Sequence, residues 1–294
     1  MATMKTLNGY GFNATEFNGK TSDSYLLKTD TASDSAKLGG KAPKYYIQPR
    51  NLLDNSDFLH PVNQRGKTSV SNNGYFIDRW SIYSPNEANK VTSIDSNGLT
   101  TAGGGAVRQI VSKEVAPKDT GEYTFAACKS DGSIHVNNLY RNSSGDMVCP
   151  ISNAGTYIWA ALYEGNYTAD TLPPYVPKGY PAELTECQRY FYKMKSHWKW
   201  VSAGICETST KAFIPIILPR EMRIVPTVSI TNPSLIKVKC GSVGPQIPSD
   251  ITWTYGILGA RIMQITATVT GATNGDVAFL YFDDGGEITF SADL

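Results

Sequence analysis

The sequence predicts a mainly β protein with an extended N-terminal stalk and two β-sandwich, jelly-roll-like domains, which a short helix joins. The composition supports this class, because 26 Gly, 17 Tyr and 18% charged residues among 294 suit short strands and polar turns. Apolar stretches are short and separated by turn residues, and a helical period is found in one segment. The length provides for two cores, and the predicted boundaries are 1–48, 49–182 and 183–294.

The predicted stalk, residues 1–48, is rich in Gly, Ser, Asp and Lys and contains a repeat of 21 residues. The two copies are Phe17-Asn18-Gly19-Lys20 followed by Tyr25-Leu26, and Leu38-Gly39-Gly40-Lys41 followed by Tyr46-Ile47. Such units have too few apolar residues to bury a core alone, so several chains are expected to wrap together. The repeat also explains why residues 14–21 match a loosened phosphate-loop pattern, since no buried strand precedes them and their interior lacks glycine.

A stretch dense in Asn and Asp, NLLDNSDFLHPVNQRG at 51–66, follows the stalk. Asn and Asp side chains compete for backbone hydrogen bonds and Pro61 lacks a donor, so this stretch is predicted to be the non-helical entry to a β domain. Strands are then expected at 74–80, 91–94, 106–111, 122–127, 133–136 and 157–163. Asp131-Gly132 is a hairpin signal between two of them. The last of these strands carries apolar residues on both of its faces, as expected for a strand that is buried between two layers.

A helix is predicted at 182–191, directly after Pro181, with three apolar residues on one face. These residues are Leu184, Cys187 and Phe191. The helix is expected to close the first domain and to start the second.

The second sandwich is predicted from a further series of short apolar stretches. Strands are expected at 211–218, 227–231, 235–238, 251–255, 261–269, 275–282 and 287–290. Met263, Ile265, Ala267 and Val269 alternate cleanly with polar residues, which predicts a strand with one buried face. Asp283-Asp284-Gly285-Gly286 predicts a hairpin between the last two strands.

Charge and cysteine content exclude several classes of protein. Lys plus Arg number 27 against 26 Asp plus Glu without a basic block, so the footprint of a nucleic-acid binder is missing. The N-terminus lacks the apolar centre of a secretion signal, and no apolar run reaches the roughly 20 residues that span a bilayer, which predicts synthesis in a cytosol without membrane insertion. The cysteines are never paired as CxxC and are expected to be buried thiols rather than zinc ligands or disulfides. They are Cys128, Cys149, Cys187, Cys206 and Cys240.

Recognisable catalytic motifs are missing from the sequence. Its three histidines form no metal-binding motif, and neither GxSxG nor GxGxxG follows a strand. Asp54 with Asp57, or Asp283 with Asp284, could form a carboxylate pair for glycoside cleavage or a calcium site, although turn formation is the simpler interpretation. No catalytic residue, metal or cofactor is therefore predicted, and a glycan hydrolase or esterase stays open as an alternative.

Two pairs of aromatic residues are the candidates for ligand binding. Trp198 and Trp200 are two residues apart, so both indoles would project from one face of a strand, and Trp253 with Tyr255 repeats this spacing. Flat aromatic faces bind the apolar side of sugar rings, which makes these four residues candidate saccharide contacts. Packing in a core is the alternative for each of them. Core positions are expected for three aromatic residues of apolar strands, namely Trp80, Trp159 and Tyr163.

Several segments resemble parts of bacteriophage tail fibres, in the order in which they occur there. SDSAKLGGKAPKYY at 33–46 is similar to linker repeats. NLLDNSDF at 51–58, PVNQRG at 61–66 and YFIDRW at 75–80 resemble the start of a carbohydrate-binding-module-like sandwich. ELTECQRYF at 183–191 and MRIVPTV at 222–228 are similar to segments in the C-terminal parts of tail fibre and receptor-binding proteins.

The resemblance implies a component of a phage virion or of a phage-tail-like bacteriocin, assembled in the host cytoplasm and homotrimeric in most relatives. Its N-terminus would attach to tail or baseplate proteins, and its C-terminal domain would face the bacterial host. The implied function is a non-enzymatic adhesin that binds cell-surface saccharide. A purely structural adaptor between baseplate and fibre is a further alternative.

Overall fold

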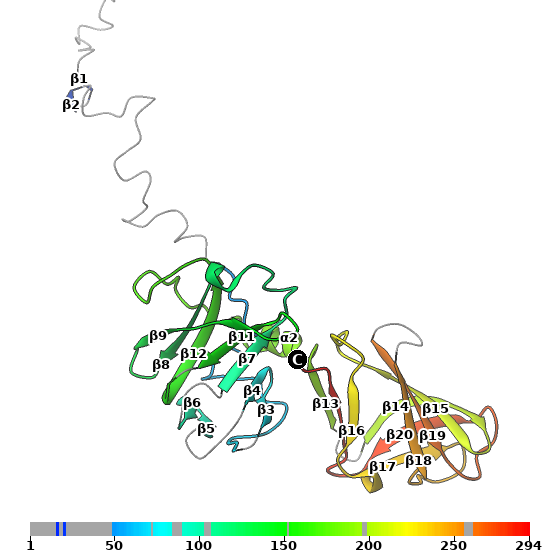
Figure 1. Cartoon of the computed structure of the whole chain (residues 1–294). Helices are drawn as coiled ribbons and strands as arrows, with labels where there is room; N and C mark the ends of the chain where they lie inside the picture. Colours follow the sequence, from blue (N-terminus) through cyan, green and yellow to red (C-terminus); the bar gives the residue numbers. More distant parts are fainter. Residues whose placement is uncertain are drawn as a thin grey trace, which may run out of the picture. The chain divides into compact units, whose positions relative to one another are not determined.

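A computed structural model gives the fold of the chain (Figure 1). It describes residues 16–17, 20–21, 49–71, 73–83, 90–102, 107–151, 153–195, 199–255 and 261–294. The chain forms two compact units, Met1–Pro49 and Arg50–Leu294. In the first, β1 (Glu16–Phe17) pairs antiparallel with β2 (Lys20–Thr21). The rest of the predicted stalk, with all of its repeat except Phe17 and Lys20, lies outside the described residues. The second contains four antiparallel sheets and a short helix, which confirms the mainly β fold class.

Two five-stranded antiparallel sheets form the N-terminal sandwich. Their strand orders are β10-β11-β7-β4-β3 and β5-β6-β12-β8-β9. The bounds are β3 Gly74–Ile77, β4 Trp80–Ile82, β5 Val91–Asp95, β6 Gly98–Thr101, β7 Val107–Val111, β8 Tyr123–Lys129, β9 Ile134–Asn137, β10 Tyr140–Arg141, β11 Met147–Ile151 and β12 Gly155–Glu164, with a 3-10 turn η3 at Thr120–Glu122. The hairpin predicted at Asp131-Gly132 is confirmed, because β8 pairs with β9.

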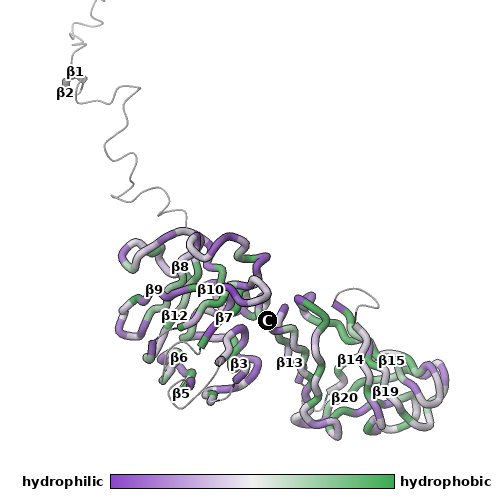
Figure 2. Tube along the Cα trace, in the orientation of Figure 1, coloured by the Kyte–Doolittle hydropathy of each residue, from purple (hydrophilic) through white to green (hydrophobic). Residues whose placement is uncertain are grey.

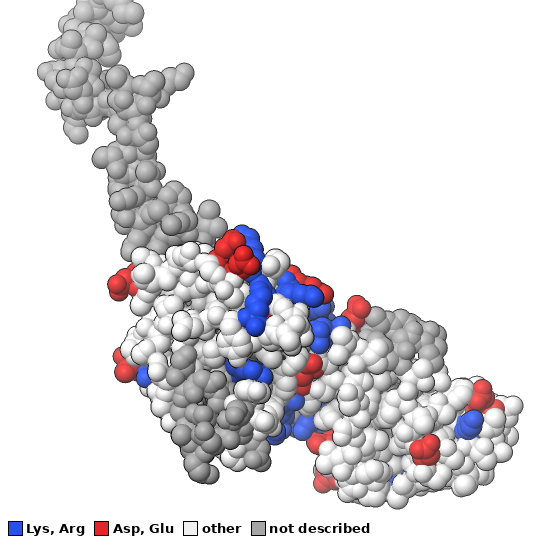
Figure 3. All heavy atoms as spheres, in the orientation of Figure 1, with Lys and Arg blue, Asp and Glu red and all other residues white. Residues whose placement is uncertain are grey.

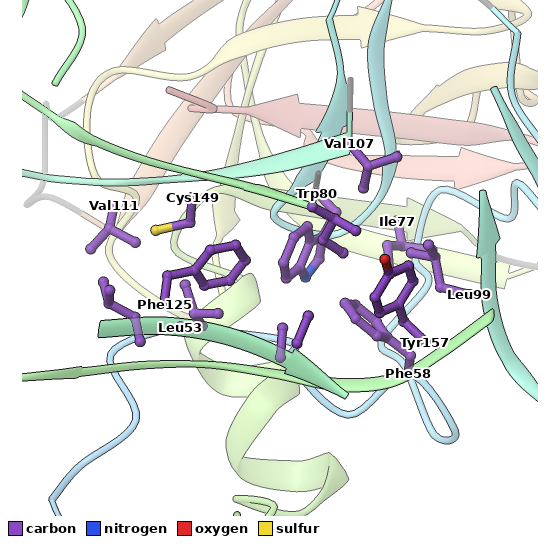
Figure 4. Packing of buried hydrophobic residues seen from close by; sticks show 14 of the residues in the cluster. Leu53, Phe58, Ile77, Trp80, Leu99, Val107, Val111, Phe125, Cys149 and Tyr157 are labelled. Atoms are coloured by element: carbon purple, nitrogen blue, oxygen red, sulfur yellow. The ribbon is translucent and has the colours of Figure 1, made fainter. Parts of the chain in front are cut away.

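The core of this sandwich is built around Trp80 (Figure 4). The rings of Phe58 and Trp80 pack edge to face with centroids 5.0 Å apart, and both side chains are fully buried. Over Ala160–Tyr163, the side chains on both faces of β12 are buried, as its apolar sequence predicted. One face contributes to the Trp80 core, and the other packs in a smaller cluster with Leu172.

The Asn- and Asp-rich entry segment runs alongside β12. Asn51 Oδ1 accepts a hydrogen bond from the backbone nitrogen of Leu162 at 2.9 Å. Asn55 is buried with a φ of 53°, a left-handed conformation that Asn tolerates better than most residues. Its carboxamide donates to the carbonyl oxygens of Val62 and Asp78 at 2.8 and 2.7 Å and accepts from Val62 N at 2.7 Å. Side-chain amides therefore supply the hydrogen bonds that regular secondary structure would otherwise provide.

The strand predicted at 74–80 is interrupted by a turn at Asp78 and Arg79, which separates β3 from β4. Arg79 has a φ of 71°, and its guanidinium is buried. The guanidinium carbon lies 3.4 Å from the centroid of the Tyr190 ring, and Nη2 donates to the carbonyl oxygen of Ile110 at 2.9 Å. The prediction of one continuous strand was wrong, because the alternation of apolar residues gives no signal for a buried polar turn.

The helix α2 spans Tyr180–Cys187 and ends earlier than predicted. Residues 188–190 form a turn and Phe191 begins β13, so Phe191 does not extend the helical face. The buried carboxylate of Glu183 accepts a hydrogen bond from the backbone nitrogen of Asn55 at 2.6 Å. An acidic side chain therefore fixes the helix to the entry segment of the N-terminal sandwich.

A three-stranded and a six-stranded antiparallel sheet form the C-terminal sandwich. Their strand orders are β13-β21-β16 and β17-β20-β14-β15-β19-β18. The bounds are β13 Phe191–Lys195, β14 Lys199–Thr208, β15 Lys211–Ile217, β16 Thr227–Ile230, β17 Ile236–Cys240, β18 Asp250–Tyr255, β19 Ile262–Thr268, β20 Val277–Phe282 and β21 Glu287–Ser291, with a 3-10 turn η4 at Pro233–Leu235. Hydrophobic residues recur along the strands of both sandwiches (Figure 2). The buried face predicted for β19 is confirmed by Met263, Ile265, Ala267 and Val269.

The hairpin predicted at Asp283–Gly286 is wrong. β20 belongs to the six-stranded sheet and β21 to the three-stranded sheet, so the turn passes from one layer to the other. Phe282 before the turn and Ile288 after it are both fully buried in the same core. Turn residues alone do not distinguish a hairpin from a change of sheet, because both reversals need the same backbone freedom.

Side chains near the C-terminus contact the N-terminal sandwich. The Arg65 guanidinium donates to both carboxylate oxygens of Asp293 at 2.8 and 2.7 Å and lies 3.9 Å from the centroid of the Phe191 ring. The Tyr75 hydroxyl donates to the backbone carbonyl of Leu294 at 2.6 Å. The cores are separate, but Arg50–Leu294 is one compact unit, so the domain boundary between 182 and 183 stays a prediction.

Asp78 is expected to make stability depend on pH. Burial raises the pKa of its carboxyl to about 6, against the hydrogen bond from Gln64 N and the charge of Arg65, which lower it. Because this pKa exceeds the ordinary value of 3.8, the folded chain binds a proton that the unfolded chain has released. The stabilisation is complete below about pH 4 and is lost as the pH rises through 6. The free energy of unfolding should therefore fall by on the order of 1 kcal/mol between pH 5 and pH 7 because of Asp78.

Urea denaturation of the wild type and of Asp78→Asn at both pH values measures this effect. The asparagine cannot titrate, so the variant should lose less stability than the wild type as the pH rises. Identical pH dependence in the two proteins would contradict the assignment.

Candidate functional site

The structure places the four predicted saccharide contacts in different environments. Trp198 and the side chain of Tyr255 lie outside the described residues, although the backbone of Tyr255 ends β18. Trp253 is half-buried and packs on the core, with its ring centroid 5.8 Å from that of Phe290 in an edge-to-face arrangement. This packing favours the core alternative for Trp253. Trp200 on β14 is 51% exposed and is available to a ligand.

Trp200 belongs to a cluster of three rings, which we call the aromatic platform: Trp200, Phe279 and Tyr281. The indole centroid lies 5.3 Å from that of Phe279 and 5.0 Å from that of Tyr281, with ring planes tilted by 56° and 59°. Strand pairing fixes this arrangement, because Trp200 lies opposite Tyr281 in the register of β14 and β20. The three rings therefore form one aromatic surface on the side of the six-stranded sheet that faces away from the core.

β20 supplies two of the three rings because its residues alternate between the faces of the sheet. Its core-facing residues are Ala278, Leu280 and Phe282, and its outward-facing residues are Val277, Phe279 and Tyr281. The sequence argument missed Phe279 and Tyr281. The residues on both faces of VAFLYF are apolar, so the sequence alone does not indicate which face of the strand lies against the core.

A cationic side chain lies at the edge of the aromatic platform. Lys239 on β17 is paired with Phe279, and its ammonium nitrogen lies 5.8 Å from the centroid of the Trp200 ring. Lys237 on the same strand forms an ion pair with Asp283 at 2.6 Å. No such carboxylate partner of Lys239 occurs among the described residues, so its ammonium can bind a hydroxyl or an acidic group of a ligand.

Apolar side chains extend the same outward face beyond the platform. Ile205 and Val277, which pair across β14 and β20, are each 50% exposed, and Ile217 on β15 is 70% exposed. Charged side chains are also sparse on the face of the C-terminal sandwich that Figure 3 shows. An exposed apolar surface of this kind is typical of a binding surface.

The carboxylates weighed for catalysis or calcium have structural partners. Asp54 accepts hydrogen bonds from Arg79 Nε at 3.3 Å and Lys178 Nζ at 3.2 Å. Asp57 accepts one from the backbone nitrogen of Leu59 at 3.0 Å, as turn-forming aspartates do. Across the described ranges, no three His, Cys, Asp or Glu side chains are grouped as metal ligands would be. The contact of Asp57 fits the turn-forming interpretation, whereas Asp54 and Asp283 form ion pairs and are largely buried.

The remaining candidate residues are structural. All five cysteines are buried as predicted, and burial raises the pKa of the Cys149 and Cys187 thiols, which disfavours a thiolate nucleophile. Trp80 and Tyr163 are buried as predicted. Trp159 is half-buried, with its ring stacked on that of Tyr175 at a centroid distance of 4.8 Å.

Comparisons of the chain with protein-family models, with curated proteins and with solved structures found no match. In the part of the chain that the structure describes, no helix has the length and apolar character needed to cross a bilayer. The aromatic platform, with Lys239 at its edge, is the candidate site that the geometry favours.

Proposed function

We propose that the chain is the receptor-binding protein of a phage or phage-tail-like tail fibre, which attaches the particle to bacterial cell-surface saccharide without catalysis. The aromatic platform carries the proposal, because exposed rings held on a sheet suit the apolar faces of sugar rings. The order of the tail-fibre-like segments along the sequence supports the same function. Tail or baseplate proteins would hold the N-terminus, and the C-terminal sandwich would contact the host.

The platform would bind a saccharide by stacking combined with polar contacts at its edge. A sugar ring on Trp200 would remove its apolar face from water and leave its hydroxyls at the rim, where Lys239 can donate hydrogen bonds. One such contact is weak, with a Kd on the order of 1 mM. Three chains in a trimer and several fibres on a particle would convert it into firm attachment through avidity.

Replacing Trp200 with alanine is expected to reduce binding to cells. Loss of the indole removes about 1–2 kcal/mol of ring contact per copy, which is roughly tenfold in the affinity of a single site. The measurement is flow cytometry of a bacterial strain that binds the fluorescent wild-type protein. The thermal unfolding midpoint should change little, because the indole lies outside the core.

Val225→Ala is the matched control, because it truncates a more exposed apolar side chain of the C-terminal sandwich that lies before β16 and outside the six-stranded sheet. It should bind as the wild type does. Undiminished binding by W200A, or equal binding to cells whose surface glycans were destroyed with periodate, would contradict the proposal. Shortened chains or released acyl groups after incubation with host polysaccharide would favour a glycan-degrading enzyme instead.

A structural adaptor is the second candidate, and the exposed side chains of Ile205, Ile217 and Val277 favour it. On this alternative the outward face of the six-stranded sheet would be covered by another fibre or baseplate protein. The wild-type chain would then fail to label any cells, and W200A would weaken assembly rather than attachment.

We expect the full-length chain to form a homotrimer whose assembly depends on the predicted stalk, residues 1–48. Light scattering should give three times the mass of one chain for residues 1–294 and a smaller assembly for residues 49–294. The reason is that the repeat in 1–48 has too few apolar residues to fold without partner copies. The mass of a single chain for the full-length protein would contradict this prediction. So would an assembly of residues 49–294 with the same number of chains as the full-length protein.

A further inference from the structure

The N-terminal sandwich contains a hollow of about 390 Å³. Residues of three segments line it: Thr120, Gly121, Tyr123 and Thr124, where η3 leads into β8; Val136–Leu139, at the end of β9; and Asn166–Thr168, after β12. Its volume lies within the range of small-molecule sites. The aromatic platform is on β14 and β20 and shares no residue with this hollow, so the hollow requires its own explanation.

The lining of the hollow is uncharged and combines polar groups with the apolar side chains of Val136 and Leu139. It presents carboxamides of Asn137, Asn138 and Asn166, hydroxyls of threonine and tyrosine, and no Lys, Arg, Asp, Glu or His side chain. An ionic ligand would find no opposite charge there, and a fully apolar ligand would remove the amides from water without replacing their hydrogen bonds. An uncharged ligand with many hydroxyl or amide groups fits this lining.

Three charged residues close to the lining in the sequence contact each other. Lys118 Nζ forms ion pairs with Glu164 and, at 3.6 Å, with Glu122. The ammonium offsets one of the two carboxylates, and none of the three residues belongs to the lining of the hollow.

The wall that carries Asn166 is fixed by hydrogen bonds. Thr124 Oγ1 donates to the carbonyl oxygen of Gly165 at 2.7 Å and accepts from the backbone nitrogen of Tyr167 at 2.9 Å. The Tyr167 ring packs edge to face on Tyr163 with centroids 6.4 Å apart. The hollow is therefore preformed, which reduces the entropy lost when a ligand binds.

Two amides of the lining are available to a ligand. Among the described residues, the side chains of Asn138 and Asn166 have no hydrogen-bond partner. Each carboxamide can donate two hydrogen bonds and accept two, which matches the mixed donors and acceptors of sugar hydroxyl and acetamido groups.

We propose that this hollow is a second saccharide site, which takes an uncharged sugar residue and binds it through Asn138 and Asn166. The choice of ligand class rests on the proposed function. A surface glycan is a polymer, so two sites on one chain can bind separate residues of it and strengthen attachment.

Saturation-transfer NMR on the full chain tests the proposal with four probes: galactose, mannose, N-acetylglucosamine and, as the charged comparison, glucuronic acid. The protein is produced in bacteria, so that Asn166 in its Asn-Tyr-Thr sequence is not glycosylated. Because the platform would also bind sugars, the comparison is made in chains that carry Trp200→Ala. At least one uncharged sugar should bind, and its affinity should fall about tenfold when the Asn138→Ala, Asn166→Ala double variant is introduced. Asn97→Ala, at an exposed turn between β5 and β6, is the control and should bind normally.

Three results would overturn the second site. They are no binding of any uncharged sugar, binding of glucuronic acid as strong as that of the uncharged sugars, or unchanged binding of the uncharged sugars in the double variant. W200A separates this outcome from the proposed function. If W200A loses attachment to cells while the double variant leaves sugar binding unchanged, the hollow is not a saccharide site and the proposed function stands. If the double variant loses sugar binding while W200A attaches normally, the second site stands and the platform is excluded.

Discussion

Replacement of Asn55 by alanine should lower the free energy of unfolding by about 4 kcal/mol or more. The substitution removes three buried hydrogen bonds and leaves the backbone groups of Val62 and the carbonyl of Asp78 without them. It also places alanine at a φ of 53°, where a side chain without a polar group costs about 1 kcal/mol. The backbone carbonyl of Asn55 accepts a hydrogen bond from the Trp80 indole, and its backbone nitrogen donates to Glu183. Alanine keeps both backbone groups, but a shift of the backbone at this position should disturb the core and α2.

Urea denaturation followed by tryptophan fluorescence measures this loss. Asn97→Ala is the matched control, because Asn97 is exposed in a turn, and it should change stability by less than about 0.5 kcal/mol. Asn55→Gly should recover part of the loss, since glycine accepts the left-handed conformation but not the hydrogen bonds. An N55A variant as stable as N97A would show that the entry segment does not hold the N-terminal sandwich together.

Gly204→Ala is expected to destabilise the C-terminal sandwich by about 3 kcal/mol or more. A Cβ at Gly204 would overlap the carbonyl oxygen of Phe213 and would lie 2.7 Å from Ile214 Cα. Both atoms belong to the backbone of β15, which cannot turn aside as a flexible side chain can. β14 would have to move away from β15, and saccharide binding should weaken because Trp200 is on β14.

The matched control is Gly244→Ala, at an exposed position where a Cβ would meet no atom within 4 Å. Its free energy of unfolding should differ from that of the wild type by less than about 0.5 kcal/mol. Calorimetry and urea denaturation of both variants give the comparison. Equal stability of G204A and G244A would contradict the close approach of β14 and β15.

Local alternation and turn residues were enough to predict the fold class, the hairpin at Asp131-Gly132 and the buried face of β19. They failed where long-range polar contacts decide the structure. The turn at Asp78 and Arg79 depends on Tyr190 and Ile110, which are distant in the sequence. The reversal after Phe282 changes sheet because both flanking strands are needed in one core, which no local signal reports.

The candidate site was predicted in part. Trp200 was identified from its spacing, whereas Phe279 and Tyr281 come from a strand far along the chain and are brought beside it by the pairing of β14 and β20. The hollow of the N-terminal sandwich was missed because it combines three segments, and its Asn and Thr residues are common in any polar turn.

The most direct test of the proposed function is fluorine NMR of the full chain labelled with 5-fluorotryptophan. The five tryptophans are assigned by single replacements with phenylalanine, and polysaccharide from a strain that binds the protein is then added. The resonance of Trp200 should shift or broaden while that of the buried Trp80 stays unchanged. Binding of the polysaccharide without any change at Trp200 would contradict the assignment of the aromatic platform as the saccharide contact.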